Sequence, residues 1–276
     1  EDAFSCIVLD SLLQNNHKII KVFCPQYKND RHSRLEKMSK INNIPFEITN
    51  DINSEEVVNE INKLSPDLIS VCHFEKIISD KIIKIPKFGC INLHPSLLPK
   101  YRGLSPQHWP IINGDDIAGI TVHFIDKGID TGDIILQKTF QIPNNIYVNE
   151  FQNLMKIYYR EIVVEAIKLL LKKSYKFKIQ SNIKGSYFGK LKESDCVIDI
   201  FKSSTLAYNL IRGVSFPYLG ARFENYIIWK CKLLELDTKL IELFESQNKL
   251  LIIINSVLYL KFRDGIIQSN KYNLLI

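Results

Sequence analysis

The first half of the chain alternates short apolar stretches with amphipathic ones, and this alternation limits the fold more than any other feature. The spacing of apolar residues predicts helices over residues 3–15 and 32–41, and a third that begins after Ser54, a good N-cap followed by acidic residues. Strands are predicted over residues 18–23, 45–48, 67–72 and 89–94. Strands that alternate with helices favour an α/β fold with a doubly wound, mostly parallel sheet, whose sites lie beyond the carboxyl ends of the strands.

The pattern changes in the second half of the chain. Strands are predicted over residues 118–126 and 133–142, on either side of a loop that contains the sequence GIDTG, and a long helix over 147–171. An irregular, basic and aromatic stretch follows over 174–191, and then a short helix over 203–213 and several short strands. We therefore expect a large α/β domain over residues 1–195 and a smaller domain over 196–276, made of a helix and a β-rich, partial-barrel unit.

Composition points to a folded protein in a reducing compartment. The chain has 276 residues, of which 46% are apolar and 24% charged. No apolar run reaches the ~18 residues of a membrane span, and the acidic start EDAFSCIVLDSLL does not resemble a signal peptide. The six cysteines are scattered without CxxC spacing, so we expect reduced thiols, no metal site and a cytoplasmic location. The missing initiator Met suggests that the natural chain begins upstream.

The stretch INLHPSLLPKYRGLSP, which ends the fourth predicted strand, concentrates polar and stiff residues. Asn92 and His94 are two residues apart, so in a strand both side chains face the same side. The prolines that follow cannot continue a strand or a helix and fix a rigid loop around that space. An amide can donate to a developing oxyanion, and an imidazole can transfer protons near neutral pH.

Such a pair needs a carboxylate to orient the imidazole or to take up a proton. Asp126, Asp130 and Asp133 are the candidates, because all three lie in or beside the GIDTG loop. Asp130 is the best placed, since it lies between Gly128 and Gly132 in a loop that can fold over a site. The residues alone therefore predict a site for proton transfer and oxyanion stabilisation.

Two runs of sequence carry a family resemblance. GCINLHPSLLPKYRG and NGDDIAGITVHFIDKGIDTGDIILQ closely resemble the folate-dependent formyltransferases, and the similarity extends over most of residues 1–222. The resemblance implies a Rossmann-like formyltransferase fold, 10-formyltetrahydrofolate as formyl donor and an amine as acceptor. It identifies Asn92, His94 and Asp130 with the family's catalytic set: Asn92 and protonated His94 would stabilise the oxyanion, and Asp130 would help to move the amine proton.

The resemblance also indicates which residues bind the formyl donor, and it limits the possible classes of acceptor. By similarity, Phe74, Glu75 and Ile77 would hold the pterin, with Asp126 in the opposite wall. The stretch GSYFGKLKESDCVIDIFKSSTLAYNLIRGVSFPYLGARF resembles methionyl-tRNA and nucleotide-linked aminosugar formyltransferases, whereas glycinamide ribonucleotide enzymes normally stop before it. The residues expected to bind the acceptor are Arg102, Gln107, Trp109, Tyr187, Phe188 and Arg212.

Two features favour an aminosugar over a tRNA. The chain lacks the Gly- and Pro-rich basic insertion that the tRNA enzymes share, and its closing segment LYLKFRDGIIQSNKYNLLI is not strongly basic. The net charge of +6 suits either an anionic small substrate or RNA. We expect formylation of a nucleotide-diphosphate aminodeoxysugar, such as a dTDP-amino-dideoxyhexose, for a surface polysaccharide such as the O-antigen of lipopolysaccharide. Methionyl-tRNA formyltransferase is the alternative, and a formyltetrahydrofolate hydrolase or an inert folate-binding module the rival classes. A homodimer through the C-terminal unit is compatible with this expectation.

Overall fold

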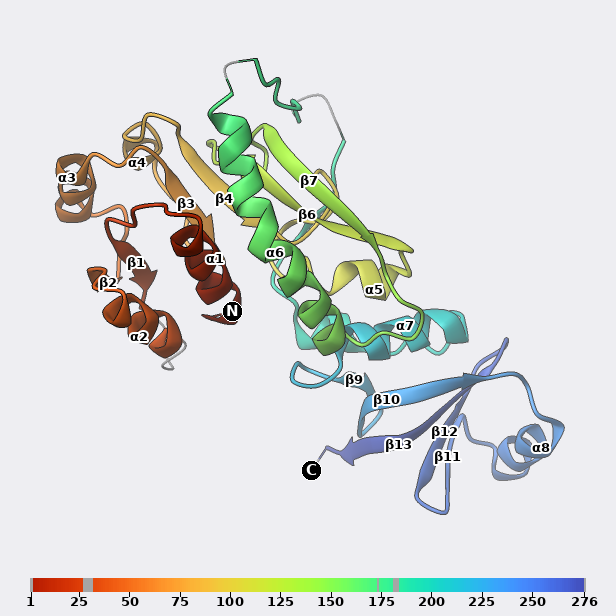
Figure 1. Cartoon of the computed structure of the whole chain (residues 1–276). Coiled ribbons are helices and arrows are strands. Elements are labelled where there is room, and N and C mark those ends of the chain that lie inside the picture. The colour runs from red at the N-terminus through yellow and green to blue at the C-terminus, as the bar shows by residue number, and fades with distance from the viewer. Residues whose placement is uncertain (1, 27–31, 173, 181–183, 276) are drawn as a thin grey trace. The chain divides into compact units, whose positions relative to one another are not determined.

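The computed structural model describes residues 2–26, 32–172, 174–180 and 184–275 (Figure 1). Its helices are α1 (Asp2–Gln14), α2 (Ser33–Ile41), α3 (Glu55–Leu64), α4 (Asp80–Ile83), α5 (Trp109–Asn113), α6 (Val148–Leu170), α7 (Ser204–Val214) and α8 (Thr238–Gln247), with a 3₁₀ helix η1 (Glu193–Cys196). Its strands are β1 (Val22–Pro25), β2 (Phe46–Thr49), β3 (Ile69–Cys72), β4 (Cys90–His94), β5 (Arg102–Gly103), β6 (Ile117–Phe124), β7 (Ile134–Gln141), β8 (Tyr187–Phe188), β9 (Ala221–Phe223), β10 (Tyr226–Leu234), β11 (Leu251–Ile254), β12 (Val257–Lys261) and β13 (Ile266–Leu274).

The chain forms two compact units. The first comprises Glu1–Gly103, Gly119–Thr139 and Leu154–Tyr187, and the second comprises Leu104–Ala118, Phe140–Asn153 and Phe188–Ile276. Two internal segments of the chain thus belong with the C-terminal unit. The predicted domain boundary between residues 195 and 196 stays a prediction.

The first unit has the expected α/β architecture. A four-stranded sheet has the order β3-β4-β6-β7, and β1 and β2 form a separate parallel pair. β3 and β4 are parallel, whereas β4 and β6 are antiparallel, with Ile91 opposite Phe124. The connection between these two strands, residues 95–116, contains β5 and the short helix α5.

Two helices cover the core strands of this unit. β4 is buried, with Ile91 at 0% and Leu93 at 2% exposure. α6 contributes a fully buried stripe at helical spacing, made of Met155, Tyr159, Ile162, Val163 and Ala166. α1 lies beside α6, where the Ser11 hydroxyl donates to the Arg160 carbonyl (Figure 1). These layers hold β4 rigidly, and β4 carries the predicted site residues.

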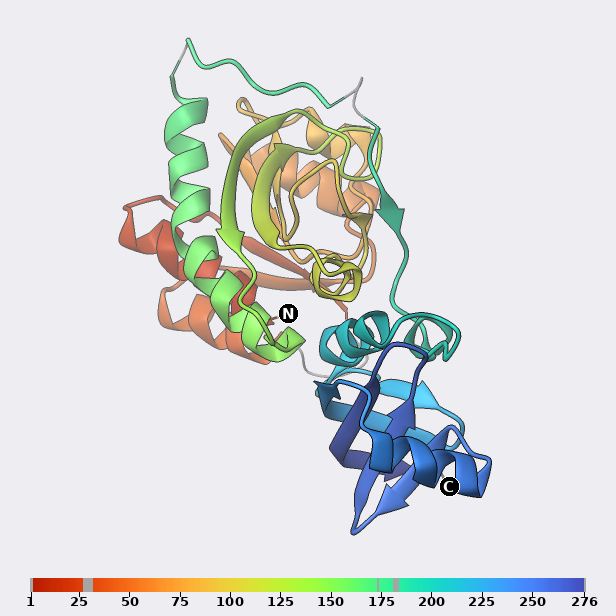
Figure 2. The same ribbon diagram turned by 90° about the vertical axis from the view of Figure 1, so that its right-hand side faces the viewer.

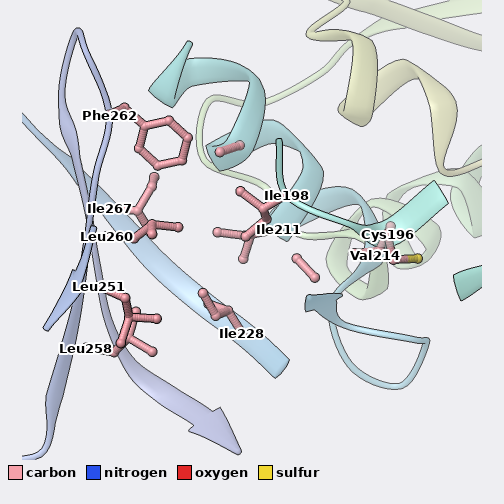
Figure 3. Close-up of a cluster of buried hydrophobic side chains, with 12 residues drawn as sticks. Cys196, Ile198, Ile211, Val214, Ile228, Leu251, Leu258, Leu260, Phe262 and Ile267 are labelled. Atoms are coloured by element: carbon pink, nitrogen blue, oxygen red, sulfur yellow. The ribbon is translucent and has the colours of Figure 1, made fainter. Parts of the chain in front are cut away.

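The second unit contains a five-stranded sheet with the order β11-β12-β13-β10-β9, in which all four neighbouring strand pairs are antiparallel. Alternate residues of its strands face opposite sides, so Leu258 and Leu260 pack toward α7 whereas Tyr259 packs toward α8. The cluster on the α7 side includes Ile211, Ile228 and Phe262 (Figure 3). Figure 2 shows α7 and α8 on different sides of this sheet. The predicted β-rich unit is confirmed as an antiparallel sheet.

Some helix and strand boundaries predicted from the sequence agree with the structure and others do not. Ser54 caps α3 as predicted, and its hydroxyl accepts from the Val57 N–H. The strand predicted over residues 18–23 begins only at Val22, because the preceding residues make no ladder hydrogen bonds. α8 was not predicted, although Asp237 caps it by accepting from the Leu240 N–H.

Candidate active site

Asn92 and His123 are direct partners across β4 and β6. Their side chains meet on one face of the sheet, where Asn92 Nδ2 lies 3.2 Å from His123 Nε2. His123 Nδ1 lies 2.7 Å from the Phe124 carbonyl, which can only accept, so Nδ1 donates to it. Nε2 is the ring nitrogen that faces Asn92 and Asp130. His123 is 2% exposed, so this pair is a fixed part of the sheet.

Asp130 lies over this pair and connects it to His94. Its Oδ1 is 3.4 Å from Asn92 Nδ2 and 3.4 Å from His123 Nε2. Its Oδ2 accepts from the Gly103 N–H at 2.8 Å and lies 3.5 Å from His94 Nδ1. The structure therefore brings together the three residues predicted to be catalytic and adds His123 to them.

The backbone of the Asp130 loop has an uncommon conformation. Asp130 has a φ of 54°, in the left-handed region, and Gly103, whose N–H it accepts from, has a φ of 94°. A Cβ at Gly132 would lie 1.9 Å from the Phe124 carbonyl oxygen, so only glycine allows the loop to approach β6 this closely. Backbone strain of this kind is common at functional sites, where the surrounding structure holds it in place.

His94 is the last residue of β4 and is 4% exposed. Its Nε2 lies 2.8 Å from the Tyr101 carbonyl, so Nε2 carries the proton and Nδ1 is the nitrogen that can gain one. Burial lowers the pKa of His94 by more than the Asp130 carboxylate and the Tyr101 carbonyl raise it. At neutral pH the resting ring is therefore neutral, with the Nδ1 lone pair toward Asp130. Desolvation disfavours the charged form of the ring. The protonated His94 expected from the sequence to stabilise the oxyanion stays a prediction.

In Asp130, by contrast, the surroundings favour the charged form of the side chain. Burial by itself would raise its pKa, but the hydrogen bond with His123, the electrostatic interaction with His94 and the Gly103 N–H together lower the pKa to about 2. The carboxylate is therefore charged at neutral pH. A buried carboxylate beside a neutral imidazole is arranged to stabilise an imidazolium when His94 takes up a proton.

The other two candidate carboxylates have different surroundings. Asp126 is exposed, and its Oδ1 accepts from the Gly128 N–H at 3.0 Å and from the Thr131 hydroxyl at 2.7 Å. It thus stabilises the turn that leads to Asp130. The Asp133 main-chain carbonyl accepts from the Phe124 N–H, which closes the loop at its other end. Of the three, Asp130 is the carboxylate that lies beside Asn92 and His94.

The loop predicted to hold the donor follows β3. His73 has a φ of 51° and is stacked on Phe4 with ring centroids 4.8 Å apart, while the Tyr159 hydroxyl lies 3.3 Å from its Nε2. Asn53 fixes the other end of the loop by donating to the Ile77 carbonyl and accepting from the Ser79 N–H. The role of His73 was unassigned from the sequence, and the structure shows that it anchors the start of this loop.

The three side chains predicted for the pterin differ in exposure. Phe74 is half-buried and packs against the core cluster around Ile82. Glu75 is exposed, and Ile77 is 74% exposed. The Asp126–Asp130 loop also presents an apolar side chain, Ile129, which is 45% exposed. Their predicted roles in donor binding stay predictions.

Two residues predicted for the acceptor lie in the first unit. Tyr187 is 57% exposed at the start of β8. Arg102 is half-buried, its NH2 group donates to Gln180 Oε1 at 3.0 Å, and its Nε is buried without a hydrogen-bond partner among the described residues. An incompletely satisfied guanidinium close to Asp130 is suited to bind an anionic or hydroxyl-rich substrate.

The other four residues predicted for the acceptor lie in the second unit. Trp109 stacks on Phe188 with ring centroids 4.2 Å apart, and its Nε1 is buried without a partner in the described part of the chain. Gln107 is half-buried in the turn before α5. Arg212 is 8% exposed and donates to the Ile146 carbonyl and to Asn209 Oδ1, so its guanidinium also fastens α7 to its own unit. Acceptor binding by these residues stays a prediction.

His123 is the site residue that sequence reasoning missed. A histidine within an apolar strand is usually a core residue, and only the β4–β6 register puts it opposite Asn92. The signal that could have revealed it is its position in the run ITVHFID, seven residues before Asp130. Among the described residues, no group of three or more His, Cys, Asp or Glu side chains is arranged to hold a metal ion. No described helix is both long and apolar enough to cross a membrane.

Comparison with known proteins agrees with this geometry. The sequence profile of the family described as Formyl transferase matches residues 3–167. Methionyl-tRNA formyltransferase of Clostridioides difficile is 34% identical over 236 residues, which cover 82% of this chain and 76% of that protein. The match extends well beyond the profile, into the region of the second unit.

Two solved structures share the fold. WlaRD, a sugar 3N-formyl transferase solved in the presence of dTDP and 5-N-formyl-THF, has a TM-score of 0.73 at 24% identity, over 96% of this chain and 93% of that one. An N-formyltransferase from Helicobacter canadensis, in complex with folinic acid and dTDP-3-aminofucose, has a TM-score of 0.63 at 20% identity, over 92% of this chain and 100% of that one. The family profile and the tRNA relative, together with this shared fold, lead to one conclusion: the chain belongs to the formyl transferase family of enzymes.

Proposed function

We propose that this enzyme transfers a formyl group from 10-formyltetrahydrofolate to the amine of a nucleotide-diphosphate-linked aminodeoxysugar. The single observation that carries the chemistry is the cluster of Asn92, His94 and Asp130, in which a neutral imidazole lies beside a largely buried carboxylate. The similarity over 96% of the chain to WlaRD, a sugar 3N-formyl transferase solved in the presence of dTDP, supports the choice of acceptor. A dTDP-amino-dideoxyhexose is the specific acceptor proposed.

The chemical step follows from the protonation states. The acceptor amine attacks the formyl carbon, and its lone pair forms the new C–N bond. The Asn92 amide donates to the oxygen on which negative charge develops, replacing its 3.4 Å contact with Asp130. His94 Nδ1 takes the amine proton, and the adjacent Asp130 carboxylate stabilises the imidazolium. His94 then delivers that proton to the departing folate nitrogen as the bond from the formyl carbon to that nitrogen breaks.

The donor would lie against the loop after β3. The exposed side chains of Ile77 and Ile129 offer apolar surface to a flat pterin ring, and main-chain groups of residues 74–77 would hydrogen-bond its edge. Phe74, Glu75 and Asp126 belong to the same two loops. Since His73 and Asn53 hold the first of these loops, the main-chain groups are positioned in advance of binding.

The acceptor would be held by its phosphates and base. Arg102 lies next to the Asp130 loop and offers a guanidinium to a phosphate or sugar hydroxyl. Tyr187, in the first unit, offers an exposed aromatic ring to a nucleotide base. Trp109 and Phe188, which stack on each other in the second unit, are a second aromatic candidate for the base. Gln107 and Arg212 complete the proposed set. The product would enter synthesis of a surface polysaccharide such as an O-antigen, and we propose a cytoplasmic enzyme that acts as a homodimer.

Methionyl-tRNA is the second candidate acceptor. Its support is the 34% identity over 236 residues to the Clostridioides difficile enzyme. Against it, helix α8 of the second unit carries Glu242 and Glu245 beside Lys239, so this helix offers no cationic face to an RNA backbone.

The test is a steady-state assay of the purified protein with 10-formyltetrahydrofolate and a panel of acceptors. The panel contains dTDP- and UDP-linked 3-amino and 4-amino sugars, together with methionyl-tRNA. We expect formylation of one nucleotide sugar, abolished by His94→Asn, which keeps the size of a polar side chain but cannot transfer a proton. Activity on methionyl-tRNA with none on any sugar would overturn the proposed acceptor.

A further inference from the structure

Gln180 is a buried glutamine that contacts two parts of the candidate site. It lies after α6, outside the residues 3–167 that match the family profile, and is 1% exposed. Its Oε1 accepts from the NH2 group of Arg102 at 3.0 Å. Its Nε2 donates to the Gly132 carbonyl at 2.5 Å and lies 3.3 Å from the Asp130 carbonyl. Both polar atoms of the side chain therefore contact either Arg102 or the Asp130 loop.

The amide group suits both contacts at once. A carboxamide has an acceptor oxygen and a nitrogen with two N–H donors, and here the oxygen faces a guanidinium while the nitrogen faces two carbonyls. Removing it would leave two main-chain carbonyls and an arginine N–H without their partner in a buried place, which is unfavourable. Neither an apolar side chain nor a carboxylate can make both sets of contacts.

The two sets of contacts fix the position of the Asp130 loop and the orientation of the Arg102 guanidinium. Asp130 is held at a φ of 54°, and the hydrogen bond to Gly132 keeps the loop over Asn92 and His123. The Nε of Arg102 has no partner among the described residues, so the hydrogen bond to Gln180 is the side-chain contact that orients the guanidinium. Displacement of a reacting group by about 1 Å can cost about 100-fold in rate.

The segment that follows Gln180 strengthens the connection. The main chain and hydroxyl of Ser186 bond the loop after His94: its N–H donates to the Pro99 carbonyl, its hydroxyl accepts from the Tyr101 N–H, and its carbonyl accepts from the Arg102 N–H. A Cβ at Gly185 would lie 2.5 Å from the Pro99 carbonyl oxygen, so the two backbones are in close contact. The chain is thus anchored to the Arg102 loop by Gln180 and again by Ser186.

We infer that Gln180 is a positioning residue that couples Arg102, on the acceptor side, to the Asp130 loop, on the proton-transfer side. This inference rests on the proposed function for the role of Arg102 in acceptor binding. As a consequence, the amide that orients Arg102 for an anionic group is the same amide that holds the Asp130 loop in place. Gln180 therefore acts on both the acceptor KM and kcat, although it touches neither reacting group.

The test uses two substitutions that separate the contacts. Gln180→Met has a similar length and removes both sets of hydrogen bonds. Gln180→Glu keeps an acceptor for Arg102 but loses the donors to the Gly132 and Asp130 carbonyls. Gln137→Met is the matched control. Gln137 is a half-buried amide of the first unit whose Nε2 donates to the Leu98 carbonyl and to the Thr121 hydroxyl, and among the described residues it has no hydrogen bond with Arg102 or Asp130.

The expected results differ between the variants. With whichever acceptor the wild-type enzyme formylates, Gln180→Met lowers kcat by about 100-fold, from the displaced loop, and raises the acceptor KM by about tenfold, from the lost orienting hydrogen bond. Gln180→Glu lowers kcat similarly but keeps the acceptor KM within about twofold, because its carboxylate still orients Arg102. Gln137→Met loses thermal stability with both constants within about twofold, since its hydrogen bonds are structural.

A second readout separates failure of this inference from failure of the proposed function. Folinic acid binding, measured by calorimetry, and the slow hydrolysis of 10-formyltetrahydrofolate need no acceptor. If the wild type formylates no sugar but Gln180→Met still weakens folinic acid binding and Gln137→Met does not, the acceptor is wrong and the coupling to the Asp130 loop stands. Values for Gln180→Met within twofold of wild type in kcat, acceptor KM and folinic acid affinity would overturn the inference, as would equal effects of Gln180→Met and Gln137→Met.

Discussion

Asn92 and His123 face each other across β4 and β6, with Asn92 Nδ2 3.2 Å from His123 Nε2. Both lie beneath Asp130 Oδ1, so the carboxylate, the amide and this second imidazole form one buried polar cluster. In such clusters each member depends on the others for its orientation. We expect His123 to be a positioning residue, and Asn92, His94 and Asp130 to be the groups that act on the substrates.

Replacing His123 by Phe should reduce kcat by about 10–100-fold, because Asn92 and Asp130 lose the imidazole that both contact. The donor KM should change little, since His123 does not belong to the loop after β3. Steady-state kinetics with the active acceptor measure both constants. His32→Phe is the matched control: His32 is also buried, at 9% exposure, but lies before α2. Equal losses in the two variants would mean that His123 contributes only to folding.

Asp130→Asn should move the acid limb of the kcat/KM profile to lower pH. Activity requires neutral His94, so the limb reports the His94 pKa in the free enzyme. The Asp130 charge raises that pKa, and its removal lets burial lower the pKa further. The rate at neutral pH should fall by about 100-fold or more, as expected for loss of proton-transfer assistance. An acid limb that stays in place, or moves to higher pH, would show that Asp130 does not act on His94.

The stability contribution of Asp130 should depend on pH in a defined direction. Its folded pKa, about 2, is below the ordinary value of 3.8, so the charged form stabilises the fold. This stabilisation, about 2 kcal/mol, is complete above pH ~4 and is lost as the pH falls toward ~2. Urea denaturation of the wild type and Asp130→Asn between these limits measures it. The difference in unfolding free energy should shrink with acidification, and a difference that grows would contradict the assigned shift.

The stability of the second unit should depend on the buried side chain of Ile211, which is 0% exposed and lies in the hydrophobic cluster drawn in Figure 3. Ile211→Ala should destabilise the protein by about 2–5 kcal/mol and Ile211→Val by about 0.5–1.5 kcal/mol, because the larger deletion leaves the larger cavity. Urea or thermal unfolding measures both. A loss below ~1 kcal/mol for the alanine variant would mean that the α7 side of the sheet is not a packed core.

The fold class could be predicted because its signals are local. Ser54 marks the start of α3 through its capping hydroxyl, and the apolar stripe around Tyr159 marks α6. The antiparallel direction of β6 could not be read in the same way, since strand pairing joins residues that are distant in sequence. Helix α8 was overlooked because the flanking residues were predicted to form strands. Its signals were Asp237, which caps the helix, and Phe244, which is buried in the cluster on that side of the sheet.

The site was predictable where the chemistry is carried by one continuous motif. Asn92 and His94 share a strand face, and their meeting with Asp130 was expected from the glycine-flanked loop. His123 and Gln180 depend on tertiary contacts, a cross-strand register and a buried segment after α6, which a single sequence does not reveal. The neutral state of His94 also required the structure, because it results from burial.

The most direct test of the central claim is a competition experiment. The purified enzyme is given limiting 10-formyltetrahydrofolate with equal concentrations of a dTDP-linked aminosugar and methionyl-tRNA, and the two formylated products are quantified. The ratio of products reports the ratio of kcat/KM for the two acceptors. We predict formylated sugar in large excess, lost in His94→Asn. Formylated methionyl-tRNA in excess would contradict the proposed acceptor, and product formation unchanged in His94→Asn would contradict the proposed role of His94.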